Sequence, residues 1–385
     1  GFGDRLGLAT PGHLAAVRGS SFLPVLAQQS IREMGRTGRT PHDVLRSAAD
    51  AVAATGYEGP WGTDADHLQT PADVAAVAAA GFRAFTLDPS AYVHDDAHAL
   101  PPERAKPAAE TAARYLGTRV ELGDGVTLAF DDATVLGRIE RKFGEALQHT
   151  AKLAEAVRAA CGEDAFELEL SIDETATPTT PLEHLFVGLE LRRLDVEVHA
   201  VAPRFCGSFE KGVDYRGDLD ELAAQYRSHV AIARHCGPYK LSIHSGSDKL
   251  SAYPLIGRLS GDHLHVKTAG TSYLEALRTV CRVDPALFTR IVALSRARFP
   301  TDRATYSISA RPDAVPAQPD PAEAEAWYLD RDDGRQILHV TYGSVLASEL
   351  AQPLRATLER HADLHAELLE RHLRHHLAML DRDFG

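Results

Sequence analysis

Side chains that can bind metals, move protons or hold anions are concentrated in six short segments of the sequence. Each segment ends or follows a run in which apolar and polar residues alternate, as they do along a β-strand. Barrel enzymes carry their catalytic side chains at the carboxyl ends of the strands, so we expect the six segments to meet at one pocket. The segments are residues 62–67, 88–89, 171–175, 204–212, 244–249 and 267–272.

Two histidines of these segments, His67 and His244, are candidate ligands of a divalent metal. Imidazole nitrogen together with nearby carboxylate oxygen suits zinc, manganese or nickel. No dense ligand motif such as HExxH is present, so this site depends on segments that meet in space. The nearby Asp64, Asp66 and Asp88 could instead cap the helices that follow them. We expect ordinary hydrogen bonds or substrate contact, rather than metal binding, for His199, His263, His265 and His339.

Basic and hydroxyl side chains of the same segments predict an anionic ligand. Gly246 and Gly270, with their Ser and Thr neighbours, resemble turns that hold anions at helix N-termini. Ordinary strand-to-helix turns with capping residues would look much the same. No GxGxxG motif follows a strand, so we do not expect a bound NAD. The predicted substrate-binding residues are Arg204, Lys211, Lys240, Ser245, Ser247, Asp248, Lys267 and Thr268.

The elements that must position these residues form an α/β pattern, in which helical stretches separate eight predicted strands. Five of the strands have one polar face, which suits a barrel with an apolar outer face and a functional interior. We therefore predict one (β/α)8 TIM-type barrel over residues 1–385, although an antiparallel sheet with a wet face is the rival. The predicted strands are residues 22–27, 58–63, 83–87, 166–172, 197–202, 239–244, 263–267 and 336–341.

Three further segments interrupt or extend this pattern. Residues 91–161 lie between strands three and four and predict an inserted subdomain, with a hairpin around the turn Gly123-Asp124-Gly125 and a long helix from about Asp132. This subdomain suits a lid or a contact between subunits, so a homo-oligomer is one of the predicted options. Residues 311–321 carry four prolines and predict a surface loop. Residues 349–385 predict a helical tail, on which histidines such as His361, His365, His372 and His376 would lie on a solvated face.

Composition excludes several classes of partner. A net charge of −13 argues against nucleic acid and against an anionic membrane, though a few basic residues can still hold a small anion. The four cysteines have no CxxC spacing and predict reduced thiols. No apolar run reaches the length of a membrane span and no leader-like segment opens the chain. We therefore expect a cytoplasmic enzyme of a small anionic substrate.

Taken together, the motifs resemble those of the tagaturonate epimerase family over most of the chain and in the same order. That resemblance implies interconversion of D-tagaturonate and D-fructuronate with a divalent metal in hexuronate catabolism. It also implies Asp66 and Glu174 as the acid/base pair, and His67, His244 and Glu210 as metal ligands. The segments that carry it are 1–7, 10–13, 64–68, 171–175, 202–205, 209–215, 244–249 and 267–275.

The chemistry of such an epimerase can be argued separately. The two keto acids differ at a hydroxyl-bearing carbon whose C–H bond the ketone does not acidify. Retro-aldol cleavage and re-addition to the other aldehyde face would invert it, with a metal and a base. A Schiff base from Lys240 or Lys267 is the competing route. The alternatives in function are a metal-dependent aldolase or ketose isomerase on a related sugar, and a sugar-binding barrel without activity.

Overall fold

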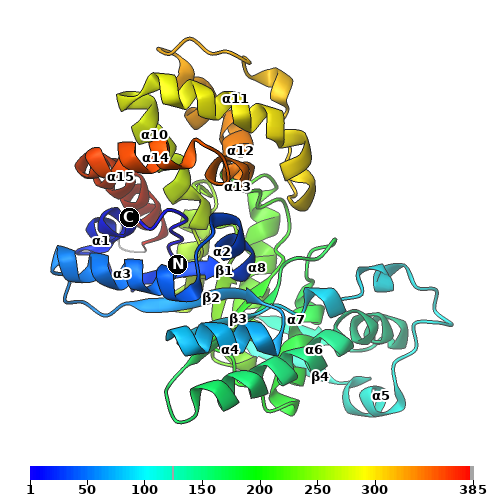
Figure 1. Cartoon of the computed structure of the whole chain (residues 1–385). Coiled ribbons are helices and arrows are strands. Elements are labelled where there is room, and N and C mark those ends of the chain that lie inside the picture. Colours follow the sequence, from blue (N-terminus) through cyan, green and yellow to red (C-terminus); the bar gives the residue numbers. More distant parts are fainter. Residues whose placement is uncertain (124, 382–385) are drawn as a thin grey trace.

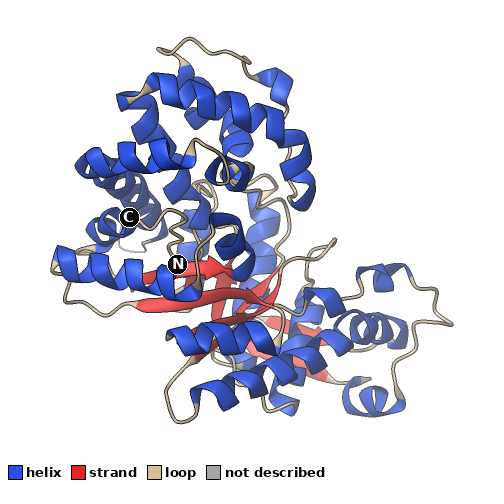
Figure 2. Cartoon of the chain, in the orientation of Figure 1, coloured by secondary structure: helices blue, strands red, loops and turns tan. Residues whose placement is uncertain are grey.

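The computed structural model describes residues 1–123 and 125–381, and its centre is a curled, seven-stranded parallel sheet surrounded by helices (Figures 1 and 2). Strands lie in the sheet in the order in which they occur in the chain. At least one helix connects each strand of the sheet to the next, as a parallel sheet requires. The strands are β1 (Val25–Ser30), β2 (Gly62–Leu68), β3 (Ala84–Leu87), β6 (Glu167–Ile172), β7 (Ala200–Pro203), β8 (Lys240–Ile243) and β9 (Leu264–Val266).

Residues Gly1 and Phe2 bridge the two edges of this sheet. The Gly1 nitrogen donates a hydrogen bond to Val266 O of β9 at 2.7 Å. The Phe2 nitrogen donates to Val25 O of β1 at 2.8 Å, and Phe2 O accepts a hydrogen bond from Gln28 N at 3.3 Å. The α/β class and the parallel sheet are therefore confirmed, but the sheet has seven strands in place of the eight of the predicted barrel, and this short extended segment lies between its two edges.

The predicted eighth strand, residues 336–341, is wrong, because nearly all of it belongs to helix α12 (Asp332–Val340). Its apolar residues Ile337, Leu338 and Val340 are buried, and the polar His339 between them is buried too. A short run of this kind fits a strand or a buried helix equally well. The acidic residues in the first turn of α12 favour the helix, because they interact with its positive N-terminal end.

Helices pack around the sheet, and several start at a Thr-Pro pair. Thr40, Thr70 and Thr180 each form a capping box with an acidic residue three positions later, and proline follows directly as the first helical residue. The helices that surround the sheet are α1 (Thr10–Val17), α2 (Ile31–Thr37), α3 (Pro41–Thr55), α4 (Pro71–Ala80), α6 (Ala133–Cys161), α7 (Pro181–Arg193), α8 (Leu219–Cys236), α9 (Tyr253–Ser260) and α15 (Ala362–Leu380).

The segment between β3 and β6 contains a small protruding part (Figure 1). It holds the short helices η1 (Ser90–Tyr92) and η2 (Asp95–Ala99), helix α5 (Ala109–Tyr115) and the antiparallel hairpin of β4 (Arg119–Gly123) and β5 (Val126–Ala129). Asp124 of the predicted turn lies outside the described residues. Helix α6 packs on α4, α7 and β3, so it is the crossover helix of the sheet, although it falls within the 91–161 segment.

A second group of helices has a hydrophobic core of its own, which includes Tyr273, Phe288, Tyr328 and Leu354. The proline-containing loop 311–321 belongs to this group. None of the described helices is long and apolar enough to cross a membrane. The group comprises α10 (Ala269–Val283), α11 (Pro285–Asp302), η3 (Arg303–Thr305), η4 (Pro312–Ala314), η5 (Ala326–Asp330), α12, α13 (Tyr342–Leu346) and α14 (Ala351–Arg360).

Helix α15 is part of the main core and not a solvated tail. Leu369 and Leu373 lie in the core of the sheet domain, and α15 packs along α1. His365 and His376 are each 2% exposed, so the predicted solvated histidine face is wrong. The interleaved Arg and Glu residues indicated the exposed side of this helix, whereas its leucines determine the side that packs.

Candidate active site

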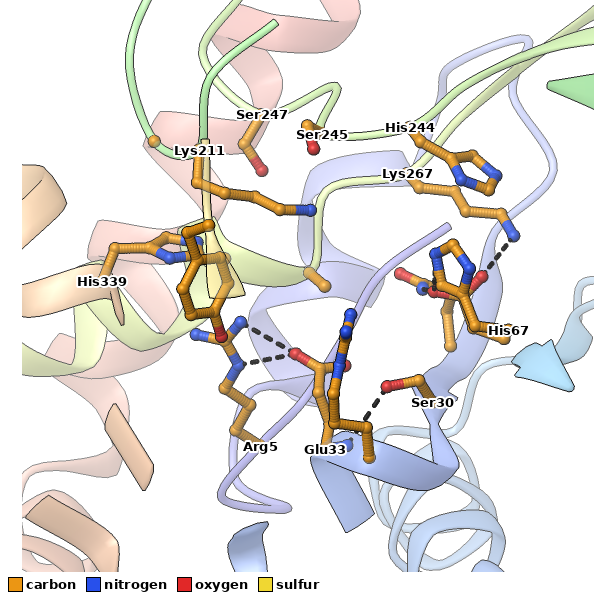
Figure 3. A pocket seen from close by; sticks show the side chains of 17 residues that line it. Arg5, Ser30, Glu33, His67, Lys211, His244, Ser245, Ser247, Lys267 and His339 are labelled. Carbon is orange, nitrogen blue, oxygen red and sulfur yellow. Dashed lines mark hydrogen bonds and ion pairs between the residues drawn. The ribbon is translucent and has the colours of Figure 1, made fainter. Parts of the chain in front are cut away.

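The carboxyl ends of the strands surround a hollow that we call the carboxyl-end cavity (Figure 3). It has a narrow lobe of about 60 Å³ and a wider lobe of about 310 Å³. Five of the six predicted chemical segments, all except residues 88–89, contribute side chains to its wall. The residues that line both lobes are Arg32, His67, Lys211, His244, Ser245 and Tyr306.

Asp66, His67 and His244 meet in this cavity, with one possible ligand atom from each lying within 4.8 Å of the others. Asp66 and His67 are neighbours on β2 and would face opposite sides of a regular strand. The register of β2 against β3 shifts between Ala65 and Leu68, and His67 has a φ of 53°. This bulge lets both side chains face the cavity, which is a common use of bulges near active sites.

Carboxylates hold the rings of both histidines. His67 Nδ1 donates to Asp88 Oδ2 at 3.1 Å, and its Nε2 lies 3.9 Å from Asp66 Oδ2. His244 Nε2 donates to Glu169 Oε1 at 2.5 Å. Its buried Nδ1 lies 3.0 Å from Asp173 Oδ1. Carboxylates orient metal-binding histidines in this way, so His67, His244 and Asp66 fit a divalent cation that would replace the protons of the two rings.

Negative charge dominates the electrostatics of this histidine pair. Burial alone would lower the pKa of His67, but Asp66 and Asp88 outweigh it and raise this pKa to about 9. Burial is likewise outweighed at His244, where Asp173 and Glu169 raise the pKa to about 10. Without another cation, both imidazoles therefore carry a proton at neutral pH. The surroundings thus favour positive charge at this point.

Lys267 lies beneath the cavity, on the inner side of the curled sheet. Within the curled sheet, its Nζ lies 2.8 Å from Asp64, 2.8 Å from Asp66 and 3.0 Å from Glu169, and it donates to Thr86 Oγ1 at 2.7 Å. Burial would lower the pKa of Lys267, but the three carboxylates raise it well above its usual value. The amine therefore stays protonated, which makes it a poor nucleophile for a Schiff base.

Other predicted site residues occupy different positions. Glu174 lines the wider lobe, and its half-exposed carboxylate lies 3.4 Å from Arg32. Glu210 also lines that lobe, but its carboxylate accepts hydrogen bonds from Ser309 and Gln336, which separates it from the histidine pair. Lys211, Ser245, Ser247 and Lys267 line the narrow lobe, and Arg204 lines the wider one. Lys240, Asp248 and Thr268 line neither lobe.

Lys249 connects the loop that carries Lys211 to the loop that carries Ser245 and Ser247. Its fully buried Nζ donates to the carbonyl oxygens of Glu210 at 2.8 Å, Val213 at 2.6 Å and Ser247 at 2.8 Å. Burial lowers the pKa of Lys249 to about 7, whereas three carbonyl acceptors favour its charged form. This lysine therefore fixes the relative position of two loops that line the cavity.

Asp248 connects the same loop to the helical regions. Its carboxylate lies 2.8 Å from Arg335 and 2.7 Å from His372. Its backbone nitrogen donates to His376 Nε2 at 2.9 Å. Asp248, His372 and His376 are close enough together to be considered for a metal, but the Arg335 guanidinium and the occupied Nε2 oppose that role. We conclude that Asp248 positions the loop.

Sequence reasoning did not select Asp88, Glu169 and Asp173 as site residues. The alternation of residues 167–173 placed Glu169 and Asp173 on the polar face of β6, which was the available signal. Asp173 Oδ1 lies 3.0 Å from His244 Nδ1 and accepts from Ser171 Oγ at 2.6 Å. Their role depends on which histidine each one faces, which the sequence alone does not specify.

Comparison with known proteins adds a chemical context. The chain matches the model of the tagaturonate epimerase family over residues 1–380. It is 40% identical to the tagaturonate/fructuronate epimerase of Thermotoga maritima, over 99% of this chain and 80% of that protein. Crystal structures of the fructuronate-tagaturonate epimerase UxaE from Cohnella laeviribosi, native and with one glycerol, match with a TM-score of 0.94 at 36% identity. Those matches cover 98% of this chain and 80% of theirs.

Proposed function

This chain belongs to the tagaturonate epimerase family and is an isomerase, and we propose that it interconverts D-tagaturonate and D-fructuronate by metal-assisted retro-aldol cleavage and re-addition. The observation that carries the mechanism is the meeting of Asp66, His67 and His244 in one cavity, where one possible ligand atom of each lies within 4.8 Å of the others. When bound there, a divalent cation would act as a Lewis acid toward the substrate ketone.

Asp66 serves better as a ligand than as a base. Its oxygens accept hydrogen bonds from Gln28 at 2.8 Å and from Lys267 at 2.8 Å. Burial would raise the pKa of Asp66, but His67 and Lys267 outweigh burial and hold this pKa well below its usual value. A carboxylate that binds protons so weakly has little driving force to remove one from a hydroxyl group.

We assign the proton transfer to Glu174. In the cleavage direction, its carboxylate takes the proton of the hydroxyl at the reacting carbon. The adjacent carbon–carbon bond then breaks to give an aldehyde, and its electron pair passes to the ketone fragment, which becomes an enediolate. A half-turn of the aldehyde presents its other face, and Glu174 returns the proton when the bond re-forms. The Glu174 side chain is 40% exposed and has one long ion pair, so it can follow the oxygen through this turn.

Asp88, Glu169 and Asp173 assist without exchanging protons with the substrate. Asp88 and Glu169 fix the rings of His67 and His244 through hydrogen bonds. Asp173 lies beside His244 and is itself held by Ser171. Ligand rings fixed in this way lose little freedom on binding, which supports tight and specific binding of a cation.

Incubation of the purified protein with tagaturonate tests the proposal, with fructuronate as the expected product. Substrate deuterated at the reacting carbon should keep its label, because the C–H bond is not broken in retro-aldol chemistry. Loss of label to water would show direct proton exchange and overturn the mechanism. Glu174→Gln should lower kcat roughly 10²–10⁴-fold and leave metal content unchanged. Near-normal turnover of that variant would remove Glu174 from the proton transfer.

A further inference from the structure

The basic side chains around the narrow lobe differ in how far their charge is already compensated. Arg5 donates to Glu33 Oε1 at 2.8 Å, and Lys267 faces three carboxylates. Lys211 is half-buried, and its ammonium group makes no hydrogen bond or ion pair to any described residue. This lysine therefore carries an uncompensated positive charge inside a concave site.

Two hydroxyl groups face the same space as the Lys211 ammonium. Figure 3 shows the side chains of Ser245 and Ser247 directed toward it from the loop after β8. Ser247 is 4% exposed, yet its hydroxyl finds no partner among the described residues. Because Ser247 lines the narrow lobe, its hydroxyl group can form a hydrogen bond with a ligand there.

The first turn of helix α10 completes the wall on this side. Ala269 and Gly270 line the narrow lobe, and the N-cap residue Thr268 makes no capping hydrogen bond with its side chain to the described part of the helix. The N-terminus of a helix carries partial positive charge and attracts anions. A Cβ atom at Gly270 would lie 1.8 Å from His339 Nε2, so a larger residue would not fit here.

We propose that Lys211, Ser245, Ser247 and the first turn of α10 form the subsite for the substrate carboxylate, and that this subsite selects keto sugar acids over neutral ketoses. The assignment rests on the proposed epimerase function. Lys211 and Ser245 line both lobes together with His67 and His244, so one sugar-sized molecule can contact the anion subsite and the histidine pair. Anion recognition and chemistry then act on opposite ends of the substrate.

The test compares kcat/KM for tagaturonate with kcat/KM for the neutral ketose that carries a hydroxymethyl group in place of the carboxylate. Lys211→Met should lower the value for the acid roughly 10–100-fold, as expected for loss of a hydrogen bond between charged groups. The value for the neutral ketose should change less than about 3-fold. Lys211→Arg should keep the preference for the acid. Lys152→Met, an exposed lysine on α6, is the matched control and should change neither value.

Equal losses on both substrates in Lys211→Met would overturn the subsite, because they would indicate a role in folding or chemistry. If the wild-type protein converts neither substrate, the proposed function fails, and calorimetric binding of tagaturonate still tests the subsite. Binding that is equally tight in the wild type and in Lys211→Met would then overturn it. Ser247→Ala provides a second test, with an expected loss of about 3–10-fold on the acid alone.

Discussion

The sheet has a cavity at each end, and the two cavities differ in size and chemistry. The one at the amino ends of the strands is the larger, at about 700 Å³, and its wall includes Phe2, Leu23, Leu373 and Leu377. The carboxyl-end cavity is smaller and is lined mostly by charged and polar side chains. Lys267 and its carboxylate partners lie between them. The proposed active site is therefore the smaller cavity, in which charged side chains converge, and not the larger one.

Lys267→Met should have the largest effect, because it removes the cation that separates the two cavities. Asp64, Asp66 and Glu169 would remain buried without their partner, which should lower the free energy of unfolding by about 3–5 kcal/mol. Chemical denaturation measures this change, and epimerase activity should disappear with it. Lys240→Met is the control, because its ion pair with Glu167 is partly exposed. A Lys267→Met protein as stable as the wild type would disprove the central role of this lysine.

Histidines at the two ends should respond to pH in opposite directions. Burial lowers the pKa of His376, at the amino-end cavity, to about 4. Between pH 6.5 and 4 the unfolded chain binds a proton at this position that the folded chain does not bind, so stability falls as pH falls. The loss should approach about 3 kcal/mol. At His67 and His244 the pKa values are raised to about 9 and about 10, so the folded metal-free protein binds protons there more tightly than the unfolded chain. The stability that this gives is lost as the pH rises from about 6.5 to about 10.

The free energy of unfolding of metal-free His376→Gln, measured from pH 4 to pH 8, tests whether His376 causes the loss of stability at acidic pH. The variant should lose less stability between pH 6.5 and 4 than the wild type loses. His235→Gln, on α8 and partly exposed, should follow the wild-type curve. Parallel curves for His376→Gln and the wild type would assign the acid sensitivity to other groups.

Asp88→Asn should weaken metal binding roughly 10–100-fold, because it removes the carboxylate that orients His67. Titration of the metal-free protein with zinc, manganese or nickel measures the affinity directly. Asp131→Asn changes an exposed aspartate before α6 and should have no effect. Unchanged affinity in Asp88→Asn would argue against His67 as a ligand.

Leu23→Ser should have the smallest effect. Leu23 lines the amino-end cavity but is 57% exposed, so the substitution should change the free energy of unfolding by less than about 0.5 kcal/mol. The values of kcat and KM should stay at the wild-type level. A clear change in KM would mean that substrate enters the amino-end cavity, and would reverse the functional contrast between the two ends.

Seven strands and the meeting of His67 with His244 could be anticipated from the sequence, because both depend on local alternation and on where strands end. The bulge at His67 was not foreseeable, since it arises from the pairing of β2 with β3. The wrong strand prediction for residues 336–341 has a similar origin, because the segment is helical where it packs into the core of the second group of helices. Glu210 shows a further limit. Its position in a promising loop did not reveal that Ser309 and Gln336 hold its carboxylate.

The contact between Asp248 and α15 has a consequence for the order of folding. Helix α15 follows every strand in the chain, so a ribosome releases the strands long before His372 and His376 can reach Asp248. Contacts of such large sequence separation form slowly, because a long loop must close first. The sheet can therefore assemble early in synthesis, while the loop that carries Ser245 and Ser247 acquires its final position only when the last described helix docks.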